Sequence, residues 1–450
     1  MEWRWSALTA LGKKTKRIAG WAASCALLLC CLLFPSESAA QQIYTYVGRV
    51  GTNSFLLAWG TTEGDGNTIG RNSASLGPAF VEVAGRRIAS ARNWVEVDRL
   101  SPDTDYPYRL TIRGAIAGVG TVRTHPVRAS KLAFFVLGDY GTGKRPQYRI
   151  AEVMERERAR RVRSDNPVRF VLTTGDNIYE DRRLGIFTSN NGSRDRDWGR
   201  KVFEPYAAMR KSIPFYPAPG NHDVPAMQPE PNGEPGPYLD NFFLPTAELF
   251  PYYTFSYGGL ADFFALDTTA IQEDRSLGSI EPDSPQFLWL KKSLAASRAP
   301  WKIPYFHHAP FNAGPGHAPN LPRLRHVVQL FSEAGVRAVF SGHEHNFQIS
   351  EQNGSTGGVL YVVSGAGGEL RSGNIRNNMA RSHIAATAPQ NHFLLVELEG
   401  RTMRITPLSW EPVRVEDPGG NPVSMPVVVE LPEERSRAHG TPSAASVSSP

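Results

Sequence analysis

The stretch LAFFVLGDYG, residues 132–141, ends an apolar strand-like run directly in polar residues, and four later stretches repeat this pattern. They are RFVLTTGDNIY (169–179), IPFYPAPGNHD (213–223), KIPYFHH (302–308) and VRAVFSGHEH (336–345). Segments with a helical pattern, such as 148–162 and 285–296, alternate with these runs, which indicates βαβ units. Because functional sites of α/β folds collect at the carboxyl ends of strands, we expect the five ends to converge on one place.

The polar residues at these ends are of types that bind metal ions in proteins. Two Asp, one Tyr, one Asn and three His offer hard or borderline donors without a thiolate, which suits iron, zinc or manganese. Seven side chains are too many for one tetrahedral zinc ion, but they suit two ions that share a carboxylate. Each signal alone is weak, because a Gly-Asp pair after a strand usually marks a turn or a helix cap. The candidates are Asp139, Asp176, Tyr179, Asn221, His307, His343 and His345.

The five motifs resemble the purple acid phosphatase pattern GDxG, GDxxY, GNH(D/E), VxxH and GHxH of the calcineurin-type metallophosphoesterases. Residues 131–412 look most like the tartrate-resistant acid phosphatase branch, through LGDYGTG, GDNIYE, GNHD and YVVSGAGG among others. The Tyr of GDxxY is diagnostic, because relatives that hydrolyse phosphodiesters usually lack it. The resemblance implies an α/β four-layer metallophosphoesterase sandwich as the catalytic domain.

The resemblance also implies two metal ions, Fe(III) and a divalent Fe, Zn or Mn, that share one bridging carboxylate. The ligands of the first ion would be Asp139, Asp176, Tyr179 and His345. The ligands of the second ion would be Asp176, Asn221, His307 and His343. A phenolate is a strong hard donor, which favours Fe(III) at the first position.

The fourth motif departs from the family pattern, because Pro304 stands where the family has Val. Two consecutive histidines then compete for one role. Counting from Trp301 without gaps selects His307, whereas His308-Ala309-Pro310 mimics the H-x-P of some relatives. We expect His307 to be the ligand and keep His308 as the alternative.

Histidines beside the ligands are candidates for contact with the substrate. His222 follows Asn221 directly and His317 lies in the loop GPGHAPN, and both resemble the family's phosphate-contacting histidines. The resemblance thus implies that Asn221, His222 and His317 bind substrate, and that a catalytic histidine acts as general acid, worth about 10²–10⁴ in rate. The alternative for His317 is an exposed loop histidine. Asp223 is expected to orient a ligating or contacting histidine.

Residues 43–125 have a different pattern, with short alternating strands separated by turn residues. The stretches YTYVGRV (44–50), SFLLAWGT (54–61), NWVEVDRL (93–100) and YPYRLTIRG (106–114) read as strands, and EGDGN (63–67) reads as a turn. LSPDTDYPYRL (100–110) resembles the tyrosine corner of fibronectin type III domains. We expect a multidomain chain whose N-terminal all-β sandwich has about seven strands and serves packing rather than binding.

Residues 432–450 lack periodicity and predict a disordered tail.

Residues 1–40 have the features of a secretory signal peptide. A basic segment precedes an uncharged run at 18–36, and Ser38 and Ala40 fit an A-x-A-like cleavage site. Cleavage would remove five positive and two negative charges, so the net charge of +6 would become +3, and all 3 cysteines would be lost. An uncleaved membrane anchor and a lipoprotein signal at Cys25 are the alternatives. We therefore expect a secreted or periplasmic protein with no membrane association in the mature form.

The predicted function is hydrolysis of phosphomonoesters by a metal-activated hydroxide, as in acid phosphatases. A phosphodiesterase or nucleotidase on the same fold is the closest alternative, and a non-catalytic binding protein on a phosphatase scaffold is another. A calcium- and iron-dependent alkaline phosphatase is disfavoured, because that type uses a Cys ligand.

The expected partner is a small phosphoester, and no basic stripe with interleaved aromatics supports nucleic acid. The loops at 180–200, 225–237 and 312–322 would select the substrate, and their Gly-, Pro- and Asn-rich sequences do not reveal it. The sequence does not indicate the oligomeric state.

Overall fold

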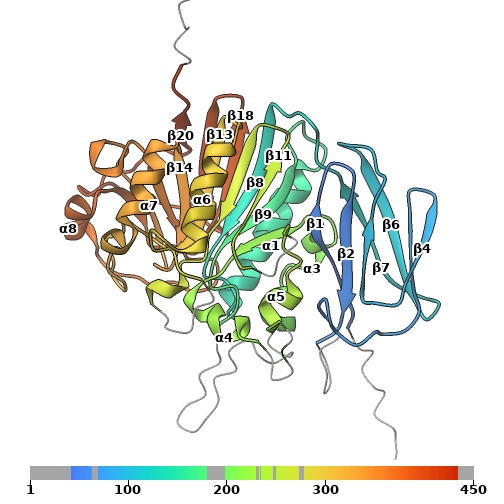
Figure 1. Cartoon of the computed structure of the whole chain (residues 1–450). Helices are drawn as coiled ribbons and strands as arrows, with labels where there is room; N and C mark the ends of the chain where they lie inside the picture. The colour runs from blue at the N-terminus through green and yellow to red at the C-terminus, as the bar shows by residue number, and fades with distance from the viewer. Residues whose placement is uncertain are drawn as a thin grey trace, which may run out of the picture. The chain divides into compact units, whose positions relative to one another are not determined.

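The computed structural model describes residues 42–62, 69–179, 198–229, 233, 235–246, 250–272 and 278–433. The predicted signal peptide, the predicted turn at 63–67 and residues 434–450 of the predicted tail lie outside the described residues. From Gln42 onward the chain forms one compact unit (Figure 1). Within the described part of the chain, no helix is both long and apolar enough to cross a membrane.

The first strands of the chain form two antiparallel sheets, which we call the N-terminal β region. One sheet has the order β1-β2-β5, with β1 (Tyr44–Val50), β2 (Phe55–Gly60) and β5 (Trp94–Val97). The other has the order β4-β3-β6-β7, with β3 (Ala79–Val83), β4 (Arg86–Ser90), β6 (Asp105–Ile112) and β7 (Ala115–Arg123). Side chains of both sheets, such as Trp59 and Leu110, enclose one buried core.

The predicted tyrosine corner has a counterpart in this region. The phenol oxygen of Tyr106, at the start of β6, accepts a hydrogen bond from the backbone N–H of Ser101 at 2.7 Å. Such a bond fixes the chain where it enters the strand.

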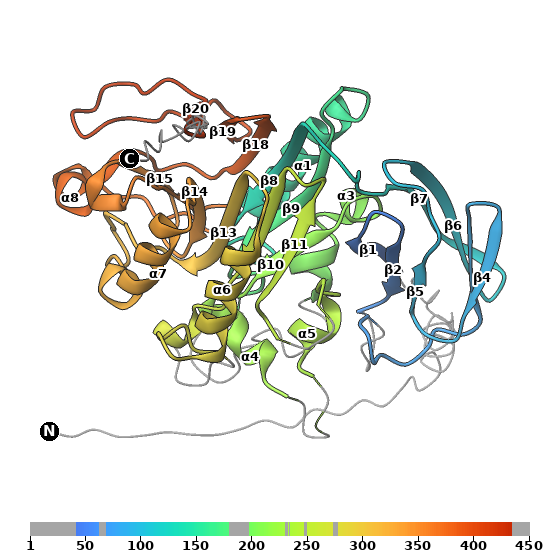
Figure 2. The ribbon, with the colours of Figure 1, turned by 45° about the horizontal axis from the view of Figure 1, so that its top comes forward.

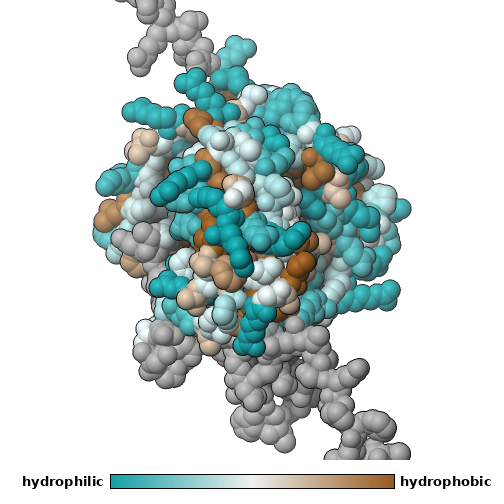
Figure 3. All heavy atoms as spheres, turned by 90° about the vertical axis from the view of Figure 1, so that its right-hand side faces the viewer, coloured by the Kyte–Doolittle hydropathy of each residue, from teal (hydrophilic) through white to brown (hydrophobic). Residues whose placement is uncertain are grey.

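Figure 3 shows that the surface on this side of the molecule is predominantly hydrophilic, with small apolar patches between polar side chains.

Two mixed sheets follow. The six-stranded sheet has the order β10-β9-β8-β18-β19-β20, with β8 (Lys131–Leu137), β9 (Val168–Thr174), β10 (Phe215–Ala218), β18 (Phe393–Glu399), β19 (Thr402–Leu408) and β20 (Val427–Glu430). The seven-stranded sheet has the order β11-β12-β13-β14-β16-β15-β17, with β11 (Tyr253–Tyr257), β12 (Ala261–Ala265), β13 (Trp301–His308), β14 (Ala338–Gly342), β15 (Phe347–Ser350), β16 (Leu360–Ser364) and β17 (Ile384–Ala388). The six-stranded sheet thus continues beyond residue 412, where the resemblance ends.

The strands that carry the motifs are parallel neighbours. β8, β9 and β10 pair in parallel in the first sheet, and β13 and β14 pair in parallel in the second. Their residues are buried almost throughout, as in β9, where every residue is buried. This explains why the sequence shows continuous apolar runs there rather than alternation.

Helices cover the outer faces of both sheets, and the two inner faces pack on each other, which gives four layers (Figures 1 and 2). The longer helices are α1 (Arg145–Arg161), α6 (Pro285–Ala296) and α7 (Leu321–Glu333). Phe134 of β8 and Phe263 of β12 meet edge-to-face between the sheets, with ring centroids 5.4 Å apart. The short helices are η2 (Gly199–Phe203), α3 (Ala207–Arg210), η3 (Asn221–Asp223), α4 (Val224–Met227), α5 (Pro237–Asn241), η4 (Thr269–Ile271), η5 (Gly354–Thr356), α8 (Arg376–Met379) and η6 (Ala380–Ser382).

The N-terminal β region shares a core with the α/β part of the chain. Tyr44, Tyr46 and Leu56 belong to the same buried cluster as the side chains between the two mixed sheets. The phenol of Tyr46 donates to the carbonyl oxygen of Asn241 at 3.0 Å, and the backbone N–H of Val50 donates to the Tyr216 phenol at 3.2 Å. These contacts are consistent with the expected packing role.

Candidate metal centre

All of the predicted ligands lie at or just beyond the carboxyl ends of the five parallel strands. β8, β9 and β10 lead into Asp139, Asp176 and Asn221, while β13 ends in His307-His308 and β14 leads into His343. Neighbouring parallel strands end at the same edge of their sheet, and the packing of the two sheets on each other brings the two sets of strand ends together.

Three of the candidate ligands have strained backbones. The φ angles of Asp139, Asp176 and His343 are +54°, +51° and +70°, which place these non-glycine residues in the left-handed region. Such conformations cost about 1–3 kcal/mol each and persist where the surrounding structure enforces them, often at functional sites. In each case the turn comes directly after a buried strand, so that the strain redirects the chain at the strand end.

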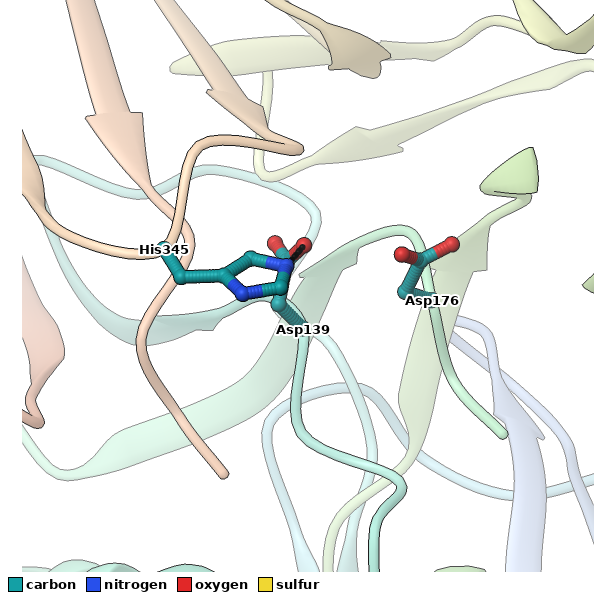
Figure 4. Close-up of side chains that lie close together, drawn as sticks. All are labelled: Asp139, Asp176 and His345. Carbon is teal, nitrogen blue, oxygen red and sulfur yellow. Dashed lines mark ion pairs between the residues drawn. The ribbon is translucent and has the colours of Figure 1, made fainter. Parts of the chain in front are cut away.

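The first group of side chains contains a phenol, a carboxylate and an imidazole. The Tyr179 phenol oxygen lies 3.2 Å from Asp139 Oδ1 and 3.2 Å from His345 Nε2. His345 Nε2 is in turn 3.3 Å from Asp139 Oδ1. Ligand atoms of Asp139, Asp176 and His345 all lie within 4.8 Å of one another (Figure 4).

The second group centres on His307 Nε2. This nitrogen is 3.1 Å from Asn221 Oδ1, 3.2 Å from His343 Nδ1 and 3.4 Å from Asp176 Oδ1. On the other side of the ring, His307 Nδ1 lies 2.9 Å from the carbonyl oxygen of Thr174, to which it donates. Nε2 therefore points at the group, and Asp176 takes part in both groups.

The electrostatics of the second group are dominated by one ion pair. Burial would lower the pKa of His307, but the adjacent Asp176 outweighs burial and raises this pKa to about 9. For Asp176 the reverse holds, because burial would raise its pKa but His307 and His222 hold it well below the ordinary range. Burial together with Asp139 raises the pKa of the Tyr179 phenol.

Glycine is required at two positions close to the carboxylate of Asp176, which takes part in both groups of candidate ligands. A Cβ at Gly220 would overlap with Asp176 Oδ1, and a Cβ at Gly175 would overlap with the ring of His307. Gly175 also has a φ of +94°, which disfavours any side chain there. The glycines of the GDxxY and GNHD motifs therefore make room for the ligand atoms.

The two consecutive histidines face different surroundings. His308 Nδ1 lies 3.0 Å from Thr268 Oγ1 and His308 Nε2 lies 3.2 Å from Gln272 Oε1, so both of its nitrogens have polar partners away from the ligand groups. His307, not His308, has a nitrogen among the ligand atoms. Pro304 in place of Val does not disturb this arrangement, because Pro304 lies within β13 and still pairs with Phe264 of β12.

The predicted substrate histidines each pack against a different candidate ligand. The His222 ring packs on the Tyr179 ring, with centroids 4.5 Å apart, and its backbone N–H donates to Asp176 Oδ1 at 3.0 Å. The His317 ring stacks on His343, with centroids 3.7 Å apart and planes 16° from parallel. Burial and the neighbouring Arg371 lower the pKa of His317, so this imidazole releases a proton more readily than an ordinary histidine.

The loop of His317 is held in place by buried polar side chains that no motif indicates. Asn312 donates to the carbonyl oxygen of His317 at 2.9 Å, and Gln348 donates to Asn312 Oδ1 at 3.0 Å. The fully buried carboxylate of Glu344 accepts the backbone N–H of His317 at 2.7 Å. The expected alternative, an exposed loop histidine, does not describe this environment.

Asp223 differs from its expected role, because its carboxylate binds backbone rather than a histidine ring. It accepts N–H groups of Gly220 at 2.8 Å, Ile178 at 3.1 Å and Asn177 at 3.2 Å, and the side-chain amide of Asn177 at 2.9 Å. Asp223 thus ties the turn after β9 to the turn after β10. Burial and the charge of Asp176 raise the pKa of Asp223 to about 7.

The donor set fits a pair of metal ions. Bonds of about 2.1 Å to one small ion place its ligand atoms roughly 3 Å apart, which is the spacing found in both groups. His307 Nε2 and His343 Nδ1 face each other at 3.2 Å, a contact that either a proton or a metal ion between the two nitrogens would stabilise. The site is buried, rich in oxygen and nitrogen and free of sulfur, so a candidate metal site exists.

Residues 131–347 match the family of calcineurin-like phosphoesterases, so this part of the chain is a calcineurin-like phosphoesterase domain. Its relatives include tartrate-resistant and purple acid phosphatases. The human tartrate-resistant acid phosphatase type 5 is 27% identical over 305 residues, which cover 61% of this chain and 86% of that enzyme. The domain and the names of these relatives support hydrolase activity.

Solved structures show the same fold. PhoD superposes with a TM-score of 0.59 at 18% identity, covering 85% of this chain and 92% of PhoD. The purple acid phosphatase PPD1 from yellow lupin (Lupinus luteus) seeds superposes with a TM-score of 0.57 at 14% identity, covering 87% of this chain and 74% of that enzyme. These likenesses confirm the predicted metallophosphoesterase sandwich for the α/β part of the chain.

Proposed function

We propose that this protein is a binuclear metal-dependent phosphomonoesterase of the acid phosphatase type. The observation that carries this proposal is the division of the ligand atoms into two groups that share Asp176. One group is Asp139, Asp176, Tyr179 and His345, and the other is Asp176, Asn221, His307 and His343. This is the distribution expected from the family resemblance.

The identity of the ions follows from the donors. The phenol of Tyr179 favours Fe(III) in the first group, and the imidazoles and amide of the second group suit a divalent Fe, Zn or Mn. When bound, such ions supply Lewis-acid activation of the phosphoryl group and of a water molecule. Asp176 would be a ligand of both ions, and the Thr174 carbonyl accepts from Nδ1 of His307, which leaves Nε2 as the nitrogen that would bind a metal.

The residues around the ions position the substrate and move its proton. His222 packs on Tyr179 and His317 stacks on His343, so both would be placed to hold phosphoryl oxygens, with Asn221 next to His222 in the chain. Burial and Arg371 lower the pKa of His317, which suits this imidazole to give a proton to the leaving oxygen. Its backbone bonds to Asn312 and Glu344 keep the ring in place during the reaction.

Two measurements test the function. Metal analysis of purified protein should find about two ions per chain, with a visible tyrosinate-to-iron absorption. Turnover of an aryl phosphate monoester should exceed that of the matching diester. Faster turnover of the diester would instead favour a phosphodiesterase, and an absence of turnover by the metal-loaded wild type would favour a binding protein. Asn221→Ala should abolish activity if the wild type is active.

The remaining parts of the chain complete the proposal. Residues 1–40 are proposed as a cleaved signal peptide that directs the protein to the periplasm or the exterior. Residues 43–125 are proposed as a fibronectin type III-like domain before the catalytic domain at 131–412, and the Tyr106–Ser101 hydrogen bond supports this proposal. N-terminal sequencing of the exported protein tests the first of these.

A further inference from the structure

Arg371 lies beside His317 at the edge of the candidate metal centre. Its backbone N–H donates to the carbonyl oxygen of His345 at 2.8 Å, which ties it to a candidate ligand. Its Nη1 lies 3.1 Å from His317 Nδ1. A permanent positive charge therefore neighbours the histidine that would meet the leaving oxygen.

The ion pair with Glu344 leaves hydrogen-bond donors of the Arg371 guanidinium unused. Arg371 Nη1 is 3.5 Å from Glu344 Oε1, longer than the ~2.7–2.9 Å of a charge-assisted hydrogen bond. The other oxygen of Glu344 already accepts the N–H groups of Gly316 and His317. Within the described part of the chain, Nη2 and Nε of Arg371 have no hydrogen-bond partner, and the side chain is 32% exposed. These donors can therefore serve a ligand.

The position of the guanidinium is built into the fold. A Cβ at Gly316 would overlap with Nη1 and Cζ of Arg371, so the guanidinium packs directly against the backbone of Gly316. Gly316 has no positive φ, so its lack of a side chain serves this contact rather than a turn. The side chains of Asn312 and Gln348 form hydrogen bonds to the backbone of the same loop.

We propose that Arg371 binds a second negative charge, carried by the leaving group of the substrate. This inference rests on the proposed function and names its substrate class. With the leaving oxygen at His317, a substituent on that oxygen comes within reach of Arg371, whose Nη1 lies 3.1 Å from His317 Nδ1. Two metal ions and two histidines already match the charge of the transferred phosphoryl group, so the extra cation suits an additional phosphate or carboxylate.

The test compares kcat/KM for phenyl phosphate, inorganic pyrophosphate and phosphoglycolate, whose leaving groups are uncharged, a phosphate and a carboxylate. Arg371→Gln should lower kcat/KM about tenfold or more for at least one anionic substrate, because a lost hydrogen bond to a charged group costs that much. Because Arg371 contacts His317, phenyl phosphate measures any loss that acts through that histidine, and the loss for the affected anionic substrate should exceed it by about tenfold. Whichever anionic substrate is affected identifies the group that Arg371 binds, and Arg371→Lys should lose less than Arg371→Gln.

Gly316→Ala provides an independent variant, because it displaces the guanidinium while keeping its charge. It should cause the same selective loss, whereas Gly354→Ala, where a Cβ meets no atom within 4 Å, should not. Arg381→Gln removes the same charge from the exposed η6 turn and should leave all three substrates unaffected. Equal losses for all three substrates in Arg371→Gln, or no loss for either anionic one, would overturn the proposal.

A binding measurement separates this proposal from the proposed function. Calorimetric titration should show tighter binding of phosphonoacetate than of methylphosphonate to the wild type, and Arg371→Gln should remove the difference. Failure of the wild type to hydrolyse phenyl phosphate would count against the proposed function alone. Equal affinities of the wild type for the two phosphonates would count against the role of Arg371, whatever the activity.

Discussion

The Nδ1–H of His307 donates to the carbonyl oxygen of Thr174, 2.9 Å away, and so joins the end of β13 in one sheet to the end of β9 in the other. This single bond selects the tautomer of His307 and aims Nε2 at Asn221 and His343. At the candidate metal centre the two sheets are therefore joined by a hydrogen bond from a candidate ligand as well as by apolar packing.

This relationship predicts different effects at the two consecutive histidines. His307→Ala should lower the metal content from about two ions to about one, and activity by about 10²-fold or more, since loss of an outer-shell partner alone costs about 10–100-fold. His308→Ala should retain both ions, because Thr268 and Gln272 occupy its nitrogens. Mass-spectrometric metal analysis of both variants checks this, and loss of metal only from His308→Ala would contradict the assignment.

Tyr179 should be responsible for the colour of the iron-loaded protein. Tyr179→Phe keeps the ring contact with His222 but removes the phenolate, so the visible absorption should disappear while the far-ultraviolet circular dichroism stays unchanged. Tyr140→Phe is the matched control, because its buried phenol donates to Asn177 Oδ1 at 3.1 Å and faces no candidate ligand atom among its described contacts. A visible band that survives in Tyr179→Phe would remove the phenolate from the iron assignment.

Asp223 should support both stability and metal affinity. Asp223→Ala leaves the N–H groups of Gly220, Asn177 and Ile178 without their acceptor, and each buried donor left unsatisfied costs about 1–3 kcal/mol. We expect a loss of at least about 3 kcal/mol in the free energy of unfolding, and weaker metal binding by about 10–100-fold. Denaturant unfolding and chelator competition measure the two effects. Asp223→Asn keeps one acceptor oxygen and should lose less, so equal losses would argue against the backbone contacts.

His125 predicts a pH dependence of stability at the junction with the N-terminal β region. Burial, assisted by Arg169, lowers the pKa of His125 to about 3, whereas an unfolded histidine titrates at about 6.5. Between these values the unfolded chain binds a proton that the folded chain excludes. The contribution is therefore fully present above pH of about 6.5 and is lost as the pH falls, by up to about 1.4 kcal/mol per pH unit.

His125→Phe should reduce this acid sensitivity, because the surrounding Phe170 and Tyr257 rings accommodate another aromatic side chain. The difference in unfolding free energy between variant and wild type should be constant above pH of about 7 and should shift in favour of the variant as the pH falls to about 4. His392, whose pKa burial lowers to about 4, is unchanged in both proteins and cancels in the comparison. A difference that does not vary with pH would contradict the prediction.

Much of the fold could be predicted because local patterns and burial agree. The helix predicted at 285–296 is α6 with the same bounds, and the strand predicted at 44–50 is β1. The predicted helix at 148–162 instead begins at Arg145, because Pro146 occupies the first turn, where its missing N–H costs nothing. The pairing of β20 with β19 could not be predicted, since its short sequence carries no signal for a partner strand.

The sequence by itself determined which residue types end the five strands, because ligand chemistry and strand-end position are both local properties. Only the tertiary structure places Nε2 of His307, rather than a nitrogen of His308, among the other candidate ligand atoms, since consecutive strand residues point to opposite faces and the packing of two sheets determines which face meets them. It also brought Glu344, Arg371 and Asn312 around His317, although no motif marks them. Contacts between segments distant in the chain depend on how layers pack, and that information is absent from any single stretch of sequence.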